Sequence, residues 1–120
     1  MELAKKLAAS SGNDLGSIKA IGEGWVAEET LAIAIFFALR YENDFELALI
    51  ASVNHGGDSD STGAVTGNIL GAKFGLAGIP EKFRTNLELY DTIIEVADDL
   101  YNGCRMTKYG AYSDEVWLRK

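Results

Sequence analysis

The sequence is poor in the residues that mark secreted or membrane-bound proteins. Its single cysteine, Cys104, cannot form a disulfide within the chain, which excludes a small scaffold held together by internal disulfides. Residues 1–10 contain no apolar run long enough for a signal peptide. The apolar run over residues 31–39 is too short to span a bilayer. We therefore expect a cytoplasmic protein.

Positive charge is also scarce. Eleven lysines and arginines face eighteen acidic residues, which gives a formal net charge of −7. The basic residues are scattered, whereas nucleic acids and anionic membranes are usually bound by clusters of them. The charge balance therefore argues against either as the main partner, and it is compatible with a cation site.

Proline occurs once and alternating β-branched runs are few, so helical patterns dominate the 120 residues. We expect one domain over residues 1–120, an all-α compact helical bundle of about five to six helices. The expected helices cover residues 2–9, 25–40, 44–55, 60–75, 80–85 and 90–102. Residues 10–24 are polar and rich in glycine, and we expect a loop there with a brief helical turn. The tail over residues 104–120 is left unassigned.

Several residues refine this prediction. The second half of the helix over 25–40 is apolar on all sides, which predicts that it is buried all round. Trp25 is expected in the core, and Asn43 is expected to cap the next helix. Asp98 and Asp99 are expected on the solvated face of the last helix, which Gly103 is placed to end.

Four glycines recur at every fourth position of the helix over 60–75: Gly63, Gly67, Gly71 and Gly75. Each glycine inside a helix costs about 1 kcal/mol relative to alanine. The spacing places them in one row along the helix, where another backbone could approach closely. We expect tight helix–helix packing along this row, which would hold the start of the helix in a fixed place.

The segment 54–63, NHGGDSDSTG, joins two predicted helices and is the richest in candidate chemistry. One interpretation is a helix cap, in which Asp60 or Ser61 accepts a hydrogen bond from a free N–H group. A calcium loop is rejected because Thr62 and Ile69 stand where its fifth and twelfth ligands should be. A D-x-D-x-T phosphatase motif fits literally, but it should follow a buried strand, and a helix precedes it here.

A site for a hard divalent cation fits the segment better. The carboxylates of Asp58 and Asp60 and the hydroxyl of Ser61 can converge where a loop turns into a helix, and magnesium prefers oxygen ligands. Gly56 and Gly57 would let the backbone come close to a ligand, and N–H groups at the helix start could hold a phosphate.

At these residues the sequence resembles the ADP-ribosylglycohydrolases, a family that includes the dinitrogenase reductase-activating glycohydrolases. The matching stretch is VNHGGDSDSTGAVTGNILGAKFGLAGIP. The family pattern is Asn-x-Gly-Gly-Asp-x-Asp-Thr, followed by small residues, Gly-Ala-x-x-Gly and Ile-Pro. Upstream, GEGWVAEETLAIAIFFAL and NDFELALIASVN resemble the two helices that precede the motif in the family. The resemblance covers residues 20–100 and the C-terminal half of the family's fold.

The resemblance implies an all-α fold with two magnesium ions beside the glycosidic bond of an ADP-ribose-type ligand. Asp58 and Asp60 would then be catalytic residues and metal ligands, and Ser61 would replace a ligating threonine. The resemblance also implies that Asn54, Gly56 and Gly57 line the ligand side. His55 lies beside the glycine pair, and we weigh ligand contact and a structural role equally for it.

Family members are more than twice as long, and their remaining metal ligands lie in an N-terminal half that this sequence does not match. Two hypotheses follow. In the first, the chain is an ADP-ribosylglycohydrolase-related protein whose site is completed by a second copy or by a complementing N-terminal subunit. Alternatively, it is a non-catalytic helical fragment that serves as an assembly or binding module, with its acids acting as caps.

Overall fold

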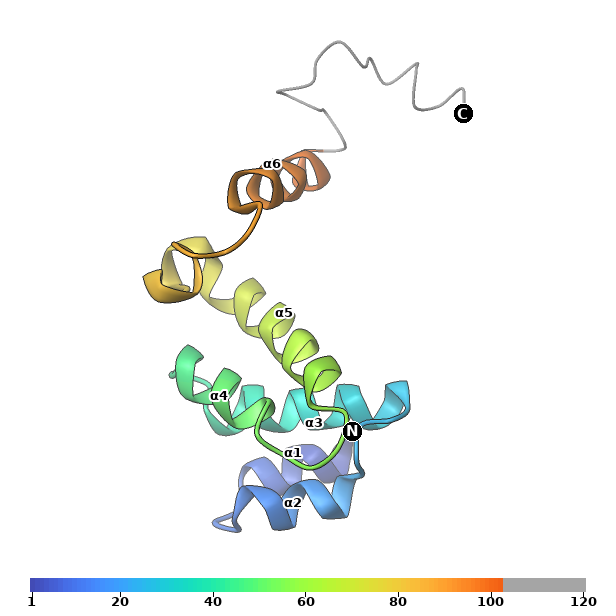
Figure 1. Cartoon of the computed structure of the whole chain (residues 1–120). Coiled ribbons are helices and arrows are strands. Elements are labelled where there is room, and N and C mark those ends of the chain that lie inside the picture. Colours follow the sequence, from blue (N-terminus) through green and yellow to red (C-terminus); the bar gives the residue numbers. More distant parts are fainter. Residues whose placement is uncertain (103–120) are drawn as a thin grey trace. The chain divides into compact units, whose positions relative to one another are not determined.

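The computed structural model describes residues 1–102, and all the regular structure in this range is helical (Figure 1). The elements are α1 (Glu2–Ala8), α2 (Asp14–Ile21), α3 (Ala27–Arg40), α4 (Phe45–Ser52), α5 (Ser59–Gly78), a 3₁₀ turn η1 (Glu81–Phe83) and α6 (Tyr90–Tyr101). The predicted all-α class is confirmed. Within the described range, every helix is too short or too polar to cross a membrane. The chain divides into two compact units, one ending at Pro80 and one beginning at Glu81.

Helix α3 is the centre of the first unit. It packs against α5, α1, α4 and α2, and its alanine-rich sequence favours both helix formation and close approach of its neighbours. The buried core joins α3 to the two N-terminal helices and contains Ala4, Ile18, Ala32, Ile33, Phe36 and Phe37. The prediction that α3 is buried all round is wrong on one side, since Leu31 is 43% exposed and Leu39 is 45% exposed.

Residues 14–21 form helix α2, although we expected a loop with only a brief helical turn. The Asn13 side chain caps this helix by accepting a hydrogen bond from the Gly16 N–H at 2.6 Å. Burial of Ile18 in the core stabilises the helix further. The helix could not be predicted from the glycine-rich composition, because its stability depends on its cap and on tertiary packing.

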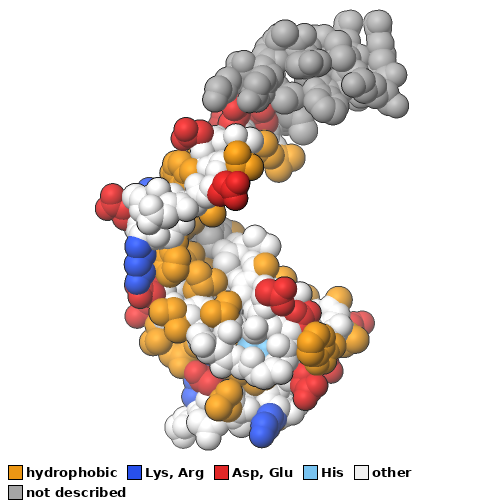
Figure 2. All heavy atoms as spheres, viewed as in Figure 1, with side chains coloured by type: hydrophobic (Ala, Val, Ile, Leu, Met, Phe, Trp, Pro, Cys, Tyr) orange, Lys and Arg blue, Asp and Glu red, His pale blue; other side chains and the backbone are white. Residues whose placement is uncertain are grey.

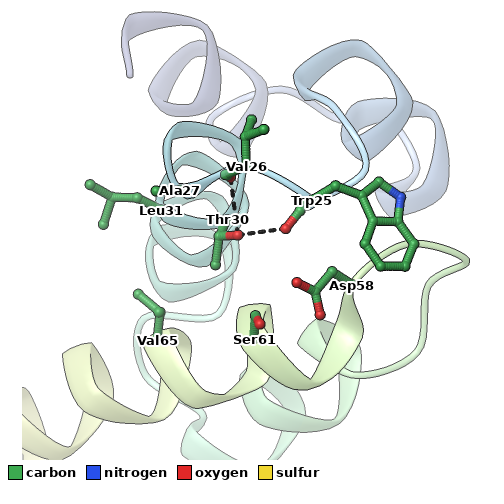
Figure 3. Close-up of a pocket in the computed structure, with 9 residues that line it drawn as sticks. Trp25, Val26, Ala27, Thr30, Leu31, Asp58, Ser61 and Val65 are labelled. Carbon is green, nitrogen blue, oxygen red and sulfur yellow. Dashed lines mark hydrogen bonds between the residues drawn. The ribbon is translucent and has the colours of Figure 1, made fainter.

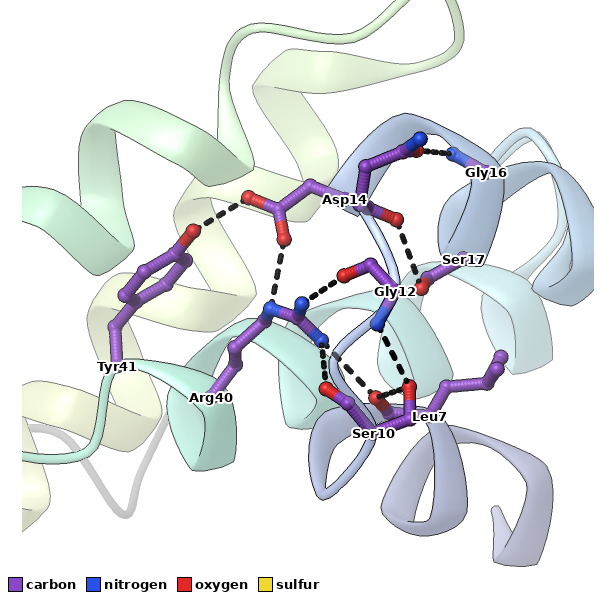
Figure 4. A network of polar contacts seen from close by, with 9 residues as sticks. Leu7, Ser10, Gly12, Asp14, Gly16, Ser17, Arg40 and Tyr41 are labelled. Atoms are coloured by element: carbon purple, nitrogen blue, oxygen red, sulfur yellow. Dashed lines mark hydrogen bonds and ion pairs between the residues drawn. The ribbon is translucent and has the colours of Figure 1, made fainter.

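A network of polar contacts joins α2 and the turn before it to the end of α3 (Figure 4). The Arg40 guanidinium lies against the turn between α1 and α2, forms an ion pair with Asp14 and donates hydrogen bonds to backbone carbonyls of the turn. Tyr41 donates its hydroxyl proton to the same Asp14 carboxylate. Arg40 therefore joins the end of α3 to the end of α1 and to the start of α2.

The loop between helices α4 and α5 carries the predicted site residues. The N-cap of α4 is Asp44, whose side chain accepts a hydrogen bond from the Leu47 N–H at 2.9 Å, so the prediction of Asn43 as the cap is wrong by one residue. Helix α5 is longer than predicted and contains a kink at Gly75, where φ is +66°. Glycine suits this left-handed conformation because it lacks a Cβ atom.

The glycine row of α5 supports close packing at its first member only. A Cβ atom on Gly63 would lie 2.4 Å from Val53 Cγ1 of the loop after α4. At Gly67 the nearest neighbour would be at an ordinary 3.8 Å, and Gly71 and Gly75 face open space. The expectation of tight packing along the whole row is therefore wrong. Helix α5 still contacts α4 near its C-terminal end, where Phe74 packs against Phe45, but it does so through side chains outside the glycine row.

In the second unit, η1 is a single 3₁₀ turn where we expected a helix over 80–85. Helix α6 agrees with the prediction for residues 90–102 and exposes an apolar stripe that includes Ile93, Val96 and Leu100. Asp99 is only 7% exposed, so its placement on the solvated face was wrong. The predictions for Gly103 and for the tail lie outside the described residues.

Candidate functional site

The loop over residues 54–58 enters α5 at the point where three predicted ligands lie. Asp58 is the N-cap residue, and its backbone carbonyl accepts a hydrogen bond from the Thr62 N–H at 3.2 Å. Its own N–H donates to the Glu23 carbonyl at 2.9 Å. The start of α5 is therefore fixed to the segment 22–25, which precedes α3.

Glycines allow these two segments to touch. A Cβ atom on Gly57 would lie 1.8 Å from the Glu23 carbonyl oxygen. This distance is too short for any residue other than glycine. Gly24 has φ of +84°, and a Cβ atom there would lie 3.1 Å from Thr62 Cγ2. Gly56, in contrast, faces open space. The observed close approach at Gly57 is between two parts of the chain, while its predicted approach to a ligand stays a prediction.

The carboxyl groups of Asp58 and Asp60 lie together. The hydrogen bond with the Asp58 side chain, followed by the N–H groups of Asp60 and Ser61, holds the pKa of the Asp60 carboxyl below its usual value, and slight desolvation opposes this. Two neighbouring carboxylates repel each other unless a proton or a cation lies between them. The structure thus brings together two of the three predicted metal ligands at the first turn of α5, with Ser61 adjacent.

A cavity of about 340 Å³ adjoins Asp58 (Figure 3). Its lining comes from the segment before α3, the first turns of α3 and the first turns of α5: Gly24, Trp25, Val26, Ala27, Thr30, Leu31, Asp58, Ser61 and Val65. The walls are largely apolar, with the Asp58 carboxylate and the Ser61 hydroxyl on the α5 side. The volume falls in the usual range for small-molecule sites.

Trp25 forms part of this lining and is 67% exposed, so its expected place in the core is wrong. It stands just before the N-cap of α3, where the chain passes over the outside of the helix bundle. Its indole Nε1–H donates to Glu23 Oε2 at 3.2 Å. An exposed aromatic ring beside a carboxylate is a feature that a core assignment from composition overlooks.

Glu29 and Thr30 of α3 hold the segment 22–25 in place. Glu29 Oε2 accepts hydrogen bonds from the N–H groups of Glu23 and Gly24, each at 3.1 Å. The Thr30 hydroxyl donates to the Gly24 carbonyl at 2.6 Å. This role of Glu29 was not predicted from the sequence. The pattern Gly22-x-Gly24 before a helix start was the available signal for such a turn.

The polar residues of the loop also have partners. The Asn54 side chain donates to the Ile50 carbonyl at 2.6 Å, at the end of α4. His55 Nδ1 accepts from the Gly57 N–H at 3.1 Å, and Nε2 lies 2.7 Å from Thr62 Oγ1. Burial lowers the pKa of His55, while the nearby Asp58 acts in the opposite direction. The predicted ligand contacts of Asn54, His55, Gly56 and Gly57 stay predictions.

The donor set on this chain is small. Within residues 1–102, histidine, cysteine and acidic side chains form no group of three or more that could hold a metal ion. Figure 2 shows acidic side chains (red) near the single histidine (pale blue) on the face that carries the loop. The described residues therefore contribute two carboxylates and the Ser61 hydroxyl at this place.

Comparison with known proteins decides the family. The family model described as ADP-ribosylglycohydrolase matches residues 1–110. The chain belongs to the ADP-ribosylglycohydrolase family. The resemblance over residues 20–100 is thereby confirmed and extends further toward both ends.

Three curated relatives show how much of an ADP-ribosylglycohydrolase this chain represents. An uncharacterized protein of Archaeoglobus fulgidus is 44% identical over 66 residues, which is 55% of this chain and 21% of the relative. ADP-ribosylhydrolase ARH3 of Homo sapiens is 29% identical over 94 residues, or 70% of this chain and 26% of the relative. ADP-ribosylarginine hydrolase Tri1 of Serratia proteamaculans is 33% identical over 73 residues, or 61% and 20%. The chain thus spans about a quarter or less of each, and no solved structure matches it significantly.

Proposed function

We propose that this cytoplasmic chain supplies one side of a magnesium-assisted site that hydrolyses an ADP-ribosyl glycosidic bond. The proposal rests on one observation: Asp58 and Asp60 interact through their side chains at the start of α5, and Asp58 lines a cavity whose wall includes the exposed Trp25. Family membership supports the reaction class.

The residues present suit magnesium in kind. Asp58, Asp60 and Ser61 offer oxygen donors and a charge of −2, and Mg²⁺ prefers oxygen ligands while keeping several waters. When bound, magnesium would supply a positive charge that orients ribose hydroxyls or a water and stabilises charge that develops during cleavage. Two carboxylates do not complete a two-metal site, so we expect weak binding by this chain alone.

The residues around the pair would bind and orient the ligand. Trp25 offers an aromatic face to a planar ring, and the apolar walls near Leu31 and Val65 exclude water from one side of the cavity. Asn54, His55, Gly56 and Gly57 belong to the loop that leads into α5, and Asn54, Gly56 and Gly57 are the proposed ligand-side residues among them.

A non-catalytic role is the second candidate, because the aligned part of each relative is 20–26% of its length and the described residues provide one pair of carboxylates. In that case the chain would serve as a helical assembly or binding module. In the catalytic case, further ligands would come from a second copy of the chain or from a separate N-terminal subunit. Both partners are proposals.

Titration calorimetry with Mg²⁺, with and without ADP-ribose, tests the site. Asp58→Asn and Asp60→Asn are each expected to weaken Mg²⁺ binding at least about tenfold, because each removes one charged ligand of a small set. Asp91→Asn is the matched control, since Asp91 is an exposed acid in the second unit. An absence of heat from the unmodified chain with both ligands would favour the non-catalytic role.

Trp25 provides an independent test of the cavity. Trp25→Ala is expected to weaken ADP-ribose binding about tenfold, and Trp25→Phe less, because stacking and apolar contact at such a ring contribute about 0.5–1.5 kcal/mol beyond area burial. Mg²⁺ binding without ADP-ribose should stay close to that of the unmodified chain. Equal ADP-ribose affinity in all three proteins would show that the ligand does not enter this cavity.

A further inference from the structure

His55 has both ring nitrogens engaged, and the partners define its protonation state. The Gly57 N–H can only donate, so Nδ1 must accept and carries no proton. The neutral ring then holds its proton on Nε2 and donates it to Thr62 Oγ1. The Thr62 hydroxyl, in turn, donates to the Ser52 carbonyl at 2.8 Å or to the Ser59 carbonyl at 3.1 Å. One tautomer satisfies every group.

These contacts bracket the proposed metal ligands. Gly57 directly precedes Asp58, and Thr62 directly follows Ser61, so the imidazole bridges the two ends of the segment 57–62. Thr62 is fully buried, and so is Ser52 at the end of α4. The bridge is therefore anchored in the interior, while the carboxyl groups it flanks remain accessible.

We propose that His55 is a positioning residue: its neutral Nε2–H ring joins Gly57 to Thr62 and thereby holds Asp58 and Asp60 in the arrangement that brings their carboxyl groups together. This proposal rests on the proposed function for the meaning of that arrangement. It assigns the histidine no contact with substrate, because neither nitrogen is left to make one.

The bridge depends on pH in a defined direction. A protonated ring would turn an N–H at Nδ1 toward the Gly57 N–H, and two donors cannot bond to each other. The charged groups on the surrounding elements are Asp58 and Asp60 at the start of α5 and Glu23 in the segment 22–25. Asp58 favours the protonated ring, but burial outweighs it and lowers the pKa. The bridge is thus complete above about pH 6.5 and is lost as pH falls through the lower folded-state pKa.

The sole histidine makes a direct test possible, since any imidazole signal from the chain without a purification tag belongs to His55. Nitrogen-15 NMR should show an unprotonated Nδ1 and a protonated Nε2 at pH 7.5, with a titration midpoint below about 6.5. A mixture of tautomers, or a midpoint at or above that value, would overturn the proposal. This experiment needs no metal and no substrate.

Variants then separate positioning from general stability. His55→Ala should speed hydrogen exchange of the Gly57 amide about tenfold, because that amide loses its partner. His55→Asn should restore much of the protection, since its side-chain oxygen can stand near the Nδ1 position. Unchanged exchange in His55→Ala would overturn the proposal.

Magnesium affinity provides the functional readout. His55→Ala is expected to weaken Mg²⁺ binding about fivefold or more and to remove the part of its pH dependence below neutrality. Thr62→Val should do the same and Thr62→Ser should not, with Thr92→Val of α6 as the matched control. If the unmodified chain binds no Mg²⁺, the proposed function fails, whereas the tautomer and the amide exchange still decide the role of His55.

Discussion

Gly57→Ala is expected to destabilise the first unit by about 2–4 kcal/mol and to separate the start of α5 from the segment before α3. A Cβ atom at this position would lie 1.8 Å from the Glu23 carbonyl oxygen, far inside contact distance. The obstacle is backbone and cannot rotate away, so the two segments must move apart. That movement breaks the hydrogen bond from the Asp58 N–H to the Glu23 carbonyl.

The neighbouring glycine is the matched control. Gly56→Ala places its Cβ atom in open space, and Gly56 has no left-handed φ, so we expect a change within about 0.5 kcal/mol. Urea unfolding of the two variants measures the difference. If both lose the same stability, the loop is more adaptable than the contact at Glu23 indicates, and the fixed geometry of the site is refuted.

The second large effect is expected at Arg40. Arg40→Met should cost about 3 kcal/mol of unfolding free energy, because it leaves a half-buried carboxylate without its ion pair and turn carbonyls without donors. Arg40 Nε lies 2.8 Å from Asp14 Oδ1, and the two side chains are 15% and 27% exposed (Figure 4). The guanidinium also donates to the carbonyls of Leu7 and Ser10, at 3.0 and 3.2 Å, and to that of Gly12.

Two variants give this prediction its control and its pH signature. Lys6→Met removes the same charge from an exposed position of α1 and should have little effect.

The hydrogen bond from Tyr41 to Asp14 is the largest cause of a raised pKa for Tyr41. Its contribution is therefore present below the usual pKa of about 10 and is lost as pH rises through the folded value, so stability above pH 10 should fall more steeply than in Tyr41→Phe. Equal losses in Arg40→Met and Lys6→Met would contradict the role of the network.

The helices with strong propensity could be predicted from the sequence because their evidence is local. Helix α3 is rich in alanine and leucine, and α6 has a clear apolar stripe ended by polar residues. Helix α2 was missed because its glycines lower its propensity, and the side chain of Asn13 with the burial of Ile18 compensates only in the folded chain. The kink at Gly75 likewise depends on backbone geometry that four-residue spacing does not encode.

The site divides in the same way. The pairing of Asp58 with Asp60 follows from their spacing at a helix start, and it could be predicted without the fold. The cavity could not, since its walls come from α3 and α5 and meet only through tertiary packing. Trp25 shows the difficulty most clearly. Its large apolar side chain suggests a core residue, whereas its position between Gly24 and the start of α3 leaves it exposed to solvent.

The contact between Gly57 and Glu23 has a thermodynamic consequence. The Glu23 backbone touches the residue before the carboxylate pair, and its side chain holds the indole of Trp25. The aromatic side of the cavity and its anionic side are thus joined through one amino acid. If a planar ring that binds to the indole fixes the position of Glu23, the affinity of the carboxylates for a cation rises. Thermodynamic linkage then requires the bound cation to raise the affinity for the ring by the same factor.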